Sequence, residues 1–176
     1  RWLRKGYLLP HLSINISIDQ FRRGNVLSMM ERLLKVHQLP AQKIMLEITE
    51  STLADDDQIM LQSLLRLKEL GIKISIDDFG TGYSSLARLK SYPIDELKID
   101  RSFVDEITEQ GQDRAIAQTI IAMSKTLGFS VVAEGVETQE QLETLRELGC
   151  DIVQGYLISE PISAIAFTRK FCNKLQ

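Results

Sequence analysis

Histidine and cysteine are scarce in this sequence of 176 residues, and long hydrophobic runs are missing altogether. The two histidines, His11 and His37, lie away from every predicted strand end, which argues against a zinc site and against histidine-based catalysis. The two cysteines, Cys150 and Cys172, lack metal-binding spacing and are expected to be free thiols in a reducing compartment. No apolar run approaches the roughly 18 residues of a transmembrane helix, and no signal peptide opens the chain. We therefore expect a cytoplasmic segment without membrane contact, although other segments of a parent protein could anchor it.

An excess of positive charge is missing as well. The chain carries 21 lysines and arginines against 24 aspartates and glutamates, for a formal net charge of −3. Duplex nucleic acid requires a basic surface, so it is not an expected partner. A small anionic ligand remains compatible with this balance, because bound metal ions can supply positive charge locally. A composition that is 44% hydrophobic and 26% charged fits one globular domain.

Six short apolar segments end in polar or charged residues, and helical or loop stretches separate them. Amphipathic patterns predict helices at 58–70 and 113–127, and a capping box at Thr138 and Gln141 predicts the start of another. Glycines 71, 128 and 149 each follow a predicted helix and precede a strand. This order predicts an α/β fold, a parallel TIM-like (β/α) barrel with its helices outside. The predicted strands are 13–17, 46–51, 74–80, 97–100, 131–135 and 152–155.

A complete barrel of this kind has eight strands in about 250 residues, whereas six strands are predicted here. We therefore expect residues 1–176 to form a single domain that lacks its first two strands. The polar strand ends would then converge at one mouth, because side chains alternate between the two faces of a strand. The converging residues are Asn15, Glu47, Asp77, Lys98, Glu134 and Gln154.

Oxygen ligands without histidine or cysteine suit a hard cation such as Mg²⁺ or Mn²⁺. Asp77 and Asp78 are adjacent carboxylates that could serve two neighbouring ions, an arrangement used for phosphodiester hydrolysis. A single acid at a strand end is more often a helix cap or a surface ion pair, and residues 77–85 could be a glycine-rich turn. The Gly-x-Gly of that turn is a weak phosphate-loop signal on its own. Recurrence at six strand ends favours a functional site.

In its motifs the chain resembles the EAL-domain family of cyclic di-GMP phosphodiesterases. The resemblance runs nearly end to end, with the motifs in the family's order. They are Ser-Ile-Asn-Ile-Ser (13–17), Leu-Glu-Ile-Thr-Glu-Ser (46–51), Asp-Asp-Phe-Gly-Thr-Gly-Tyr-Ser-Ser-Leu (77–86), Leu-Lys-Ile-Asp-Arg-Ser-Phe (97–103), Val-Ala-Glu-Gly-Val-Glu (132–137) and Gln-Gly-Tyr (154–156).

This resemblance implies hydrolysis of one phosphodiester bond of cyclic di-GMP to give linear pGpG, with two Mg²⁺ or Mn²⁺ ions. It implies Asn15, Glu47 and Asp77 as ligands of one ion and Asp78 as a ligand of the other. Glu134 would be catalytic and a metal ligand, and Lys98 would contact the attacking water. Asp100, Gly135 and Gln154 would lie in the substrate site.

The resemblance further implies a homodimer. Glu50 would anchor a loop that couples the active site to the dimer interface. That loop consists of Phe79, Gly80, Thr81, Gly82, Tyr83 and Ser84.

Two features depart from the family pattern. The Glu-Ala-Leu signature, whose glutamate is a metal ligand, is absent, and we expect it on a strand before residue 1. Ile158 and Glu160 stand where the family often has an aromatic and a basic residue, which would weaken phosphate binding. Three alternatives therefore stay open: a catalytically inactive EAL-type receptor for cyclic di-GMP, a truncated fragment that is inactive as given, and a different Mg²⁺ barrel enzyme acting on a carbon acid. The expected residue type at every comparable catalytic position favours the phosphodiesterase.

Overall fold

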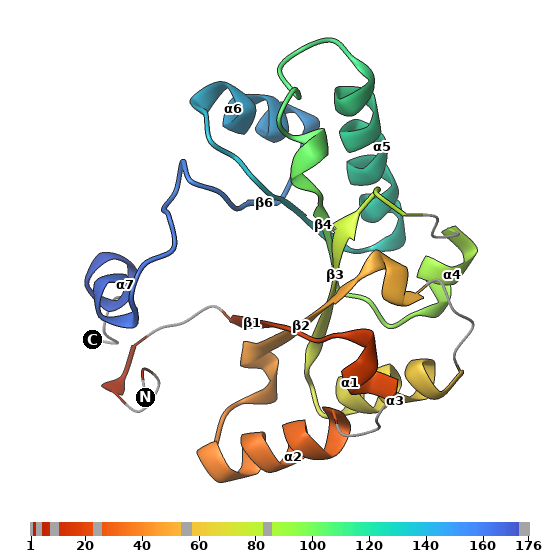
Figure 1. The fold of residues 1–176 in the computed structure, drawn as a ribbon, viewed down its shortest axis with the longest axis vertical. Coiled ribbons are helices and arrows are strands. Elements are labelled where there is room, and N and C mark those ends of the chain that lie inside the picture. Colours follow the sequence, from red (N-terminus) through yellow and green to blue (C-terminus); the bar gives the residue numbers. More distant parts are fainter. Residues whose placement is uncertain are drawn as a thin grey trace.

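Six strands form one parallel sheet whose spatial order follows the chain (Figure 1). The computed structural model describes residues 2, 5–7, 11–22, 26–53, 58–82 and 86–172. The strands are β1 (Leu12–Asn15), β2 (Ile44–Thr49), β3 (Lys73–Phe79), β4 (Glu96–Ile99), β5 (Ser130–Ala133) and β6 (Ile152–Val153). Because β1 and β6 do not pair with each other, the sheet is an open half-barrel. The predicted α/β fold with six parallel strands is confirmed.

Helices connect the strands, and α1 to α6 lie around the outside of the sheet (Figure 1). The α-helices are α1 (Ile18–Arg22), α2 (Val26–His37), α3 (Gln58–Glu69), α4 (Leu86–Ser91), α5 (Gln112–Leu127), α6 (Gln139–Leu148) and α7 (Ala164–Phe171). Three short 3₁₀ helices complete the described elements: η2 (Ala41–Lys43), η3 (Glu50–Leu53) and η4 (Arg101–Phe103). In the described part of the chain, no helix is both long and apolar enough to cross a membrane.

Alternation along the central strands separates an apolar face from a polar one. The apolar side chains that meet the helices are fully buried: Leu46, Ile48, Ile74, Ile76, Leu97 and Ile99. The intervening positions carry polar side chains that are buried on the inner face of the half-barrel: Glu47, Ser75, Glu96 and Lys98. This alternation is why one strand can hold both the hydrophobic core and the candidate site.

The predicted helix boundaries are confirmed closely. Helices α3, α5 and α6 begin or end within one or two residues of the predicted positions. Thr138 and Gln141 form the predicted capping box, in which the side chain of each accepts a hydrogen bond from the backbone N–H of the other. Gly128 and Gly149 follow α5 and α6 in the left-handed conformation, with φ of 81° at both positions.

The second predicted strand is too long at its end. Pairing stops at Thr49, and the chain turns into η3 at Glu50, so the expectation of a strand reaching residue 51 is wrong. Register explains this boundary, because Thr49 is already level with Asp77 at the end of the β2–β3 ladder. The turn buries the Glu50 side chain, which is only 3% exposed.

Helix α7 lies apart from the other helices, across the open side of the sheet (Figure 1). It packs against Trp2, whose ring centroid lies 5.7 Å from that of Phe167. The Trp2 indole nitrogen also donates a hydrogen bond to the Thr168 hydroxyl at 2.6 Å. Trp2 is thereby held against α7. Cys150 and Cys172 are free thiols.

Candidate active site

Lys98 is the centre of the candidate site. Its ammonium group contacts three carboxylates, at 2.6 Å from Glu134, 2.8 Å from Asp77 and 3.3 Å from Glu47. Glu47 lies on β2, Asp77 lies on β3, and Glu134 directly follows β5. Lys98 itself lies on β4, so four consecutive strands contribute to one cluster. The Lys98 side chain is 5% exposed, and such a buried cation needs its charge matched by partners.

A local irregularity in β3 positions the two adjacent aspartates. The β3–β4 register shifts between Ile76 and Phe79, the stretch that contains Asp77 and Asp78. Asp78 has φ of +54°, a conformation that few non-glycine residues adopt. Such an irregularity redirects side chains, and it occurs often beside active sites.

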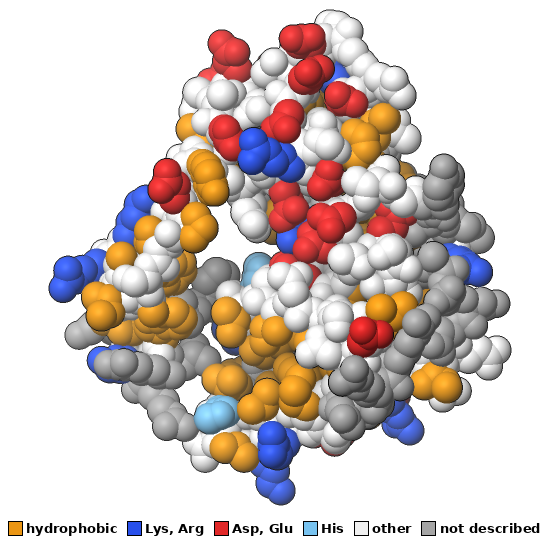
Figure 2. Space-filling view, viewed as in Figure 1, with side chains coloured by type: hydrophobic (Ala, Val, Ile, Leu, Met, Phe, Trp, Pro, Cys, Tyr) orange, Lys and Arg blue, Asp and Glu red, His pale blue; other side chains and the backbone are white. Residues whose placement is uncertain are grey.

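Asp77, Asp78 and Glu134 bring carboxylate oxygens within 4.8 Å of one another. This spacing fits a divalent cation, because oxygens from three carboxylates are the donors that Mg²⁺, Mn²⁺ and Ca²⁺ prefer. Glu47, which accepts a hydrogen bond from Lys98, adds a fourth carboxylate to this group. Figure 2 shows acidic side chains gathered at one rim of a hollow in the molecule.

The environment shifts the pKa values in this cluster. Burial raises the pKa of Glu134 above its ordinary value, although Lys98 opposes the shift. Burial and the charges of Asp77 and Asp100 likewise raise the pKa of Asp78. Burial would lower the pKa of Lys98, but its hydrogen bonds to Asp77 and Glu134, together with the charges of Glu134 and Glu47, outweigh burial and raise it. Crowded carboxylates around a charged lysine make a site that favours added positive charge.

Glu50 lies against the segment that follows Asp78. One of its carboxylate oxygens accepts hydrogen bonds from the backbone N–H groups of Gly80 and Gly82, at 2.9 and 3.1 Å. The hydroxyl of Thr81 donates to the carbonyl of Asp78 at 2.8 Å. The start of the predicted loop is thus held by Glu50 of η3 and by Asp78 of β3, and Phe79 is buried. Tyr83 and Ser84 lie outside the described residues.

The remaining predicted site residues surround the cluster. Asn15 is level with Glu47 in the β1–β2 ladder, where its side chain is exposed. Asp100 follows β4, and its carboxylate accepts from the backbone N–H and the hydroxyl of Ser102. Gln154 follows β6 and is exposed, while its backbone bonds Ala133 and Val136. Gly135, with φ of +72°, directly follows Glu134.

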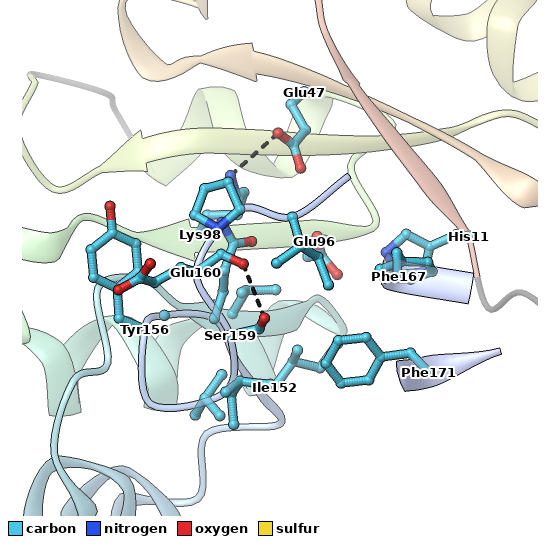
Figure 3. A pocket seen from close by; sticks show the side chains of 17 residues that line it. His11, Glu47, Glu96, Lys98, Ile152, Tyr156, Ser159, Glu160, Phe167 and Phe171 are labelled. Atoms are coloured by element: carbon cyan, nitrogen blue, oxygen red, sulfur yellow. Dashed lines mark hydrogen bonds and ion pairs between the residues drawn. The ribbon is translucent and has the colours of Figure 1, made fainter. Parts of the chain in front are cut away.

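A cavity of about 730 Å³ runs along the inner face of the sheet (Figure 3). Glu47, Lys98 and Tyr156 line it near the strand ends, and Phe167 and Phe171 of α7 line its opposite wall. Deeper in the cavity lies Glu96, which the sequence interpretation did not identify. Glu96 is 3% exposed and accepts a hydrogen bond from the Ser75 hydroxyl at 3.0 Å. Glu96 stands two residues before Lys98 on the same strand, so strand alternation alone would have placed it on the same inner face.

Comparison with known proteins places this geometry in a family. Residues 1–161 match the family of the EAL domain. MucR of Pseudomonas aeruginosa, described as a bifunctional diguanylate cyclase/cyclic di-GMP phosphodiesterase, is 43% identical over 163 residues, which cover 93% of this chain and 24% of MucR. The cyclic di-GMP phosphodiesterase RocR of the same species is 39% identical over 152 residues, which cover 86% of this chain and 39% of RocR. The chain thus spans less than half the length of these curated relatives.

Solved structures give the same result. The MucR phosphodiesterase in complex with c-di-GMP superposes with a TM-score of 0.86 at 43% identity, covering 89% of this chain and 64% of that one. Klebsiella pneumoniae BlrP1, solved as a manganese/cy-diGMP complex, superposes with a TM-score of 0.79 at 32% identity, covering 86% of this chain and 39% of that one. The motifs, the half-barrel and these similarities together show that the chain belongs to the EAL domain family.

Proposed function

We propose that this chain hydrolyses cyclic di-GMP to linear pGpG with two Mg²⁺ or Mn²⁺ ions. Water adds across one phosphodiester: its oxygen bonds to phosphorus, the bond from phosphorus to the 3′ oxygen breaks, and that oxygen leaves as a hydroxyl after gaining a proton. The observation that supports this best is the cluster of Asp77, Asp78 and Glu134 around Lys98 at adjacent strand ends in a member of the EAL family.

Each residue of the cluster receives a distinct role in this proposal. Asp77 and Glu47, together with Asn15, would hold one ion, and Asp78 the other. When bound, the ions would supply positive charge that stabilises the developing negative charge on the phosphoryl oxygens. Glu134, with its raised pKa, would hold an ion and accept a proton from the attacking water.

Lys98 would keep the carboxylates in place and orient the water, since its three contacts span the cluster. Asp100, Gly135 and Gln154 would line the substrate site around it. Glu50 and the loop of residues 79–84 would couple this site to a homodimer partner, which the hydrogen bonds to Gly80 and Gly82 favour. We further propose that the chain supplies six of the eight strands of the complete barrel.

The test is an assay of cyclic di-GMP with Mn²⁺ or Mg²⁺, with products separated by ion-exchange chromatography. We expect pGpG from the wild type and a loss of at least about 100-fold in rate for Glu134→Gln, because a general base contributes about 10²–10⁴-fold. Glu143→Gln, an exposed position on α6, is the matched control and keeps its rate. Equal rates for the Glu134 variant and wild type would refute its role. Tight binding without product would instead support a cyclic di-GMP receptor, and neither binding nor product would support an inactive fragment.

A further inference from the structure

Gln141 on α6 is a buried amide whose hydrogen-bonding capacity is completely used. Its side chain is 6% exposed. The Oε1 atom accepts from the backbone N–H groups of Glu137 and Thr138, at 2.8 and 3.0 Å. The Nε2 atom donates to the backbone carbonyls of Val104 and Asp105, at 3.2 and 3.3 Å. A primary amide has two N–H donors and two acceptor lone pairs, so all four are satisfied here.

A helix cap alone does not need this many bonds. In a capping box the side chain returns one hydrogen bond to the N-cap residue, which is Thr138 here. The two donated bonds instead leave α6 and reach residues 36 and 37 positions away in the chain. They connect the β5–α6 loop (134–138) with the β4–α5 loop (100–111), and Figure 1 shows α6 beside the latter segment.

The β5–α6 loop carries the candidate catalytic glutamate at its first position. The backbone N–H of Glu134 donates to the carbonyl of Ile99 at 3.2 Å, which is the last bond between the β4 and β5 sides. Gly135 then has φ of +72°, and the chain leaves the sheet. Only residues 135–138 separate Glu134 from the start of α6. A shift of α6 against the β4–α5 loop therefore reaches Glu134 directly.

The position of Glu134 is exacting in this site. Its carboxylate lies 2.6 Å from the Lys98 ammonium group, and its oxygen lies within 4.8 Å of those of Asp77 and Asp78. Displacements of about 1 Å at a catalytic group can lower the rate about 100-fold. Lys98 lies on β4 and Glu134 follows β5, so a side chain that joins the loops after these two strands fixes one group relative to the other.

We propose that Gln141 is a positioning residue for the hydrolysis, which holds Glu134 against Lys98 by joining the β4–α5 and β5–α6 loops. This inference rests on the proposed function, in which Glu134 accepts the proton of the attacking water. Sequence reasoning recognised Gln141 only as part of the capping box of α6.

The test is steady-state hydrolysis of cyclic di-GMP by Gln141→Glu over a series of pH values. Glutamate keeps the acceptor for Glu137 and Thr138, so the helix cap persists, but its ionised form cannot donate to Val104 or Asp105. We expect kcat to fall about 10- to 100-fold, with KM little changed. As the pH falls, protonation of the introduced glutamate restores an O–H donor, so the ratio of variant to wild-type kcat should rise.

Three controls separate positioning from folding. Gln139→Glu makes the same substitution at an exposed position of α6 and should keep the wild-type kcat at every pH. Thr138→Ala removes the helix cap but not the donated bonds of Gln141, so it should lower the unfolding midpoint and keep kcat. Gln141→Met fills a similar volume without polar atoms, so it should lose kcat without recovery at low pH.

Mn²⁺ titration by calorimetry gives a readout that needs no turnover. Gln141→Glu should bind Mn²⁺ about 10-fold more weakly than wild type, because Glu134 is a proposed ion ligand. With an active wild type, unchanged kcat in both Gln141 variants would overturn the positioning role and leave the proposed function intact. An equal loss of kcat in Thr138→Ala, or a kcat ratio for Gln141→Glu that stays flat as the pH falls, would overturn it as well. A wild type without turnover would overturn both proposals.

Discussion

The charge of buried Lys98 and of the carboxylates around it determines the electrostatics of the inner face of the half-barrel. Lys98 offers one positive charge to Glu47, Asp77 and Glu134, and Asp78 stands nearby with its own carboxylate. The single positive charge of Lys98 cannot neutralise all of these partly buried carboxylates, so the cluster keeps an excess of negative charge. The pKa values of Glu134 and Asp78 rise for this reason as well as through burial. A divalent ion bound among these carboxylates would supply the missing positive charge.

Glu96 allows a prediction at this scale that does not involve the cluster. Burial raises its pKa, although the Ser75 hydrogen bond and His11 oppose the shift. The folded state therefore holds this proton to higher pH than the unfolded chain does. As pH rises from the ordinary glutamate pKa through the raised one, the chain must lose stability relative to a variant that cannot ionise. We expect Glu96→Gln to match wild type near pH 4 and to be more stable near pH 8.

Urea unfolding followed by circular dichroism at several pH values measures this difference. Glutamine keeps an acceptor for the Ser75 hydroxyl, so the comparison isolates the charge. Glu106→Gln, an exposed position, serves as the control and should change the midpoint by little at any pH. If the free energy of unfolding of Glu96→Gln differed from that of wild type by the same amount at every pH, burial would not raise the pKa of Glu96.

At the scale of elements, what could be predicted depended on periodicity and on capping residues. Helix α5 spans 16 residues, more than four turns, so its apolar stripe is unambiguous in the sequence. Helix α1 has five residues, fewer than two turns, and its pattern cannot be separated from that of a loop. The alternation of β2 breaks at Glu50, but no glycine or proline marks a turn between Glu50 and Leu53, so the 3₁₀ helix after Thr49 could not be predicted either.

The candidate site was predictable in its residues but not in its pairings. Strand alternation placed Glu47 and Lys98 on inner faces, yet they are 51 positions apart in the chain. Which acid Lys98 contacts depends on the register of four strands and on the irregularity at Asp77 and Asp78. Register follows from the packing of the whole sheet, which no local pattern contains.

The loop after β3 gives a prediction about an element. Gly80 has φ of +104°, and an added Cβ would lie 2.7 Å from the Phe103 ring, so Gly80→Ala introduces both backbone strain and a clash. We expect a loss of about 2–5 kcal/mol, from about 1–2 kcal/mol of strain plus about 1–3 kcal/mol of overpacking. Weaker Mn²⁺ binding should accompany it, because Gly80 follows Asp78 by two residues.

Two other glycines separate these effects. Gly128→Ala at φ of +81° meets nothing within 4 Å and should cost only the strain, about 1–2 kcal/mol. Gly111, the N-cap of α5, has neither a positive φ nor a neighbour within 4 Å, so Gly111→Ala should cost only the N-cap preference for glycine over alanine, less than about 1 kcal/mol. Chemical unfolding of all three, with Mn²⁺ titration of the Gly80 variant, tests the order. Equal costs at Gly80 and Gly128 would mean that the loop yields to the added methyl.

At the scale of the whole molecule, ion binding and folding must be linked, because the acids of the cluster come together only in the folded chain. The cluster draws on strands β2 to β5, so no short segment of the chain retains it. A ligand that binds only the folded state stabilises it by RT ln(1 + [L]/Kd), about 2.7 kcal/mol at one hundred times Kd. The wild type should therefore gain thermal stability steadily with Ca²⁺ or Mn²⁺.

Asp78→Asn separates the two sides of this linkage. Without ions the variant should be more stable than wild type, because it removes a crowded carboxylate and asparagine tolerates the φ of +54°. Added ions should raise its melting temperature much less than that of wild type. At high ion concentration the variant should therefore melt below wild type. Glu69→Gln removes the same charge from an exposed pair on α3 and should follow wild type throughout. Differential scanning calorimetry over an ion series measures both effects. A variant that is less stable than wild type at every ion concentration would show that Asp78 stabilises the fold itself, and an undiminished ion response would remove it from the metal site.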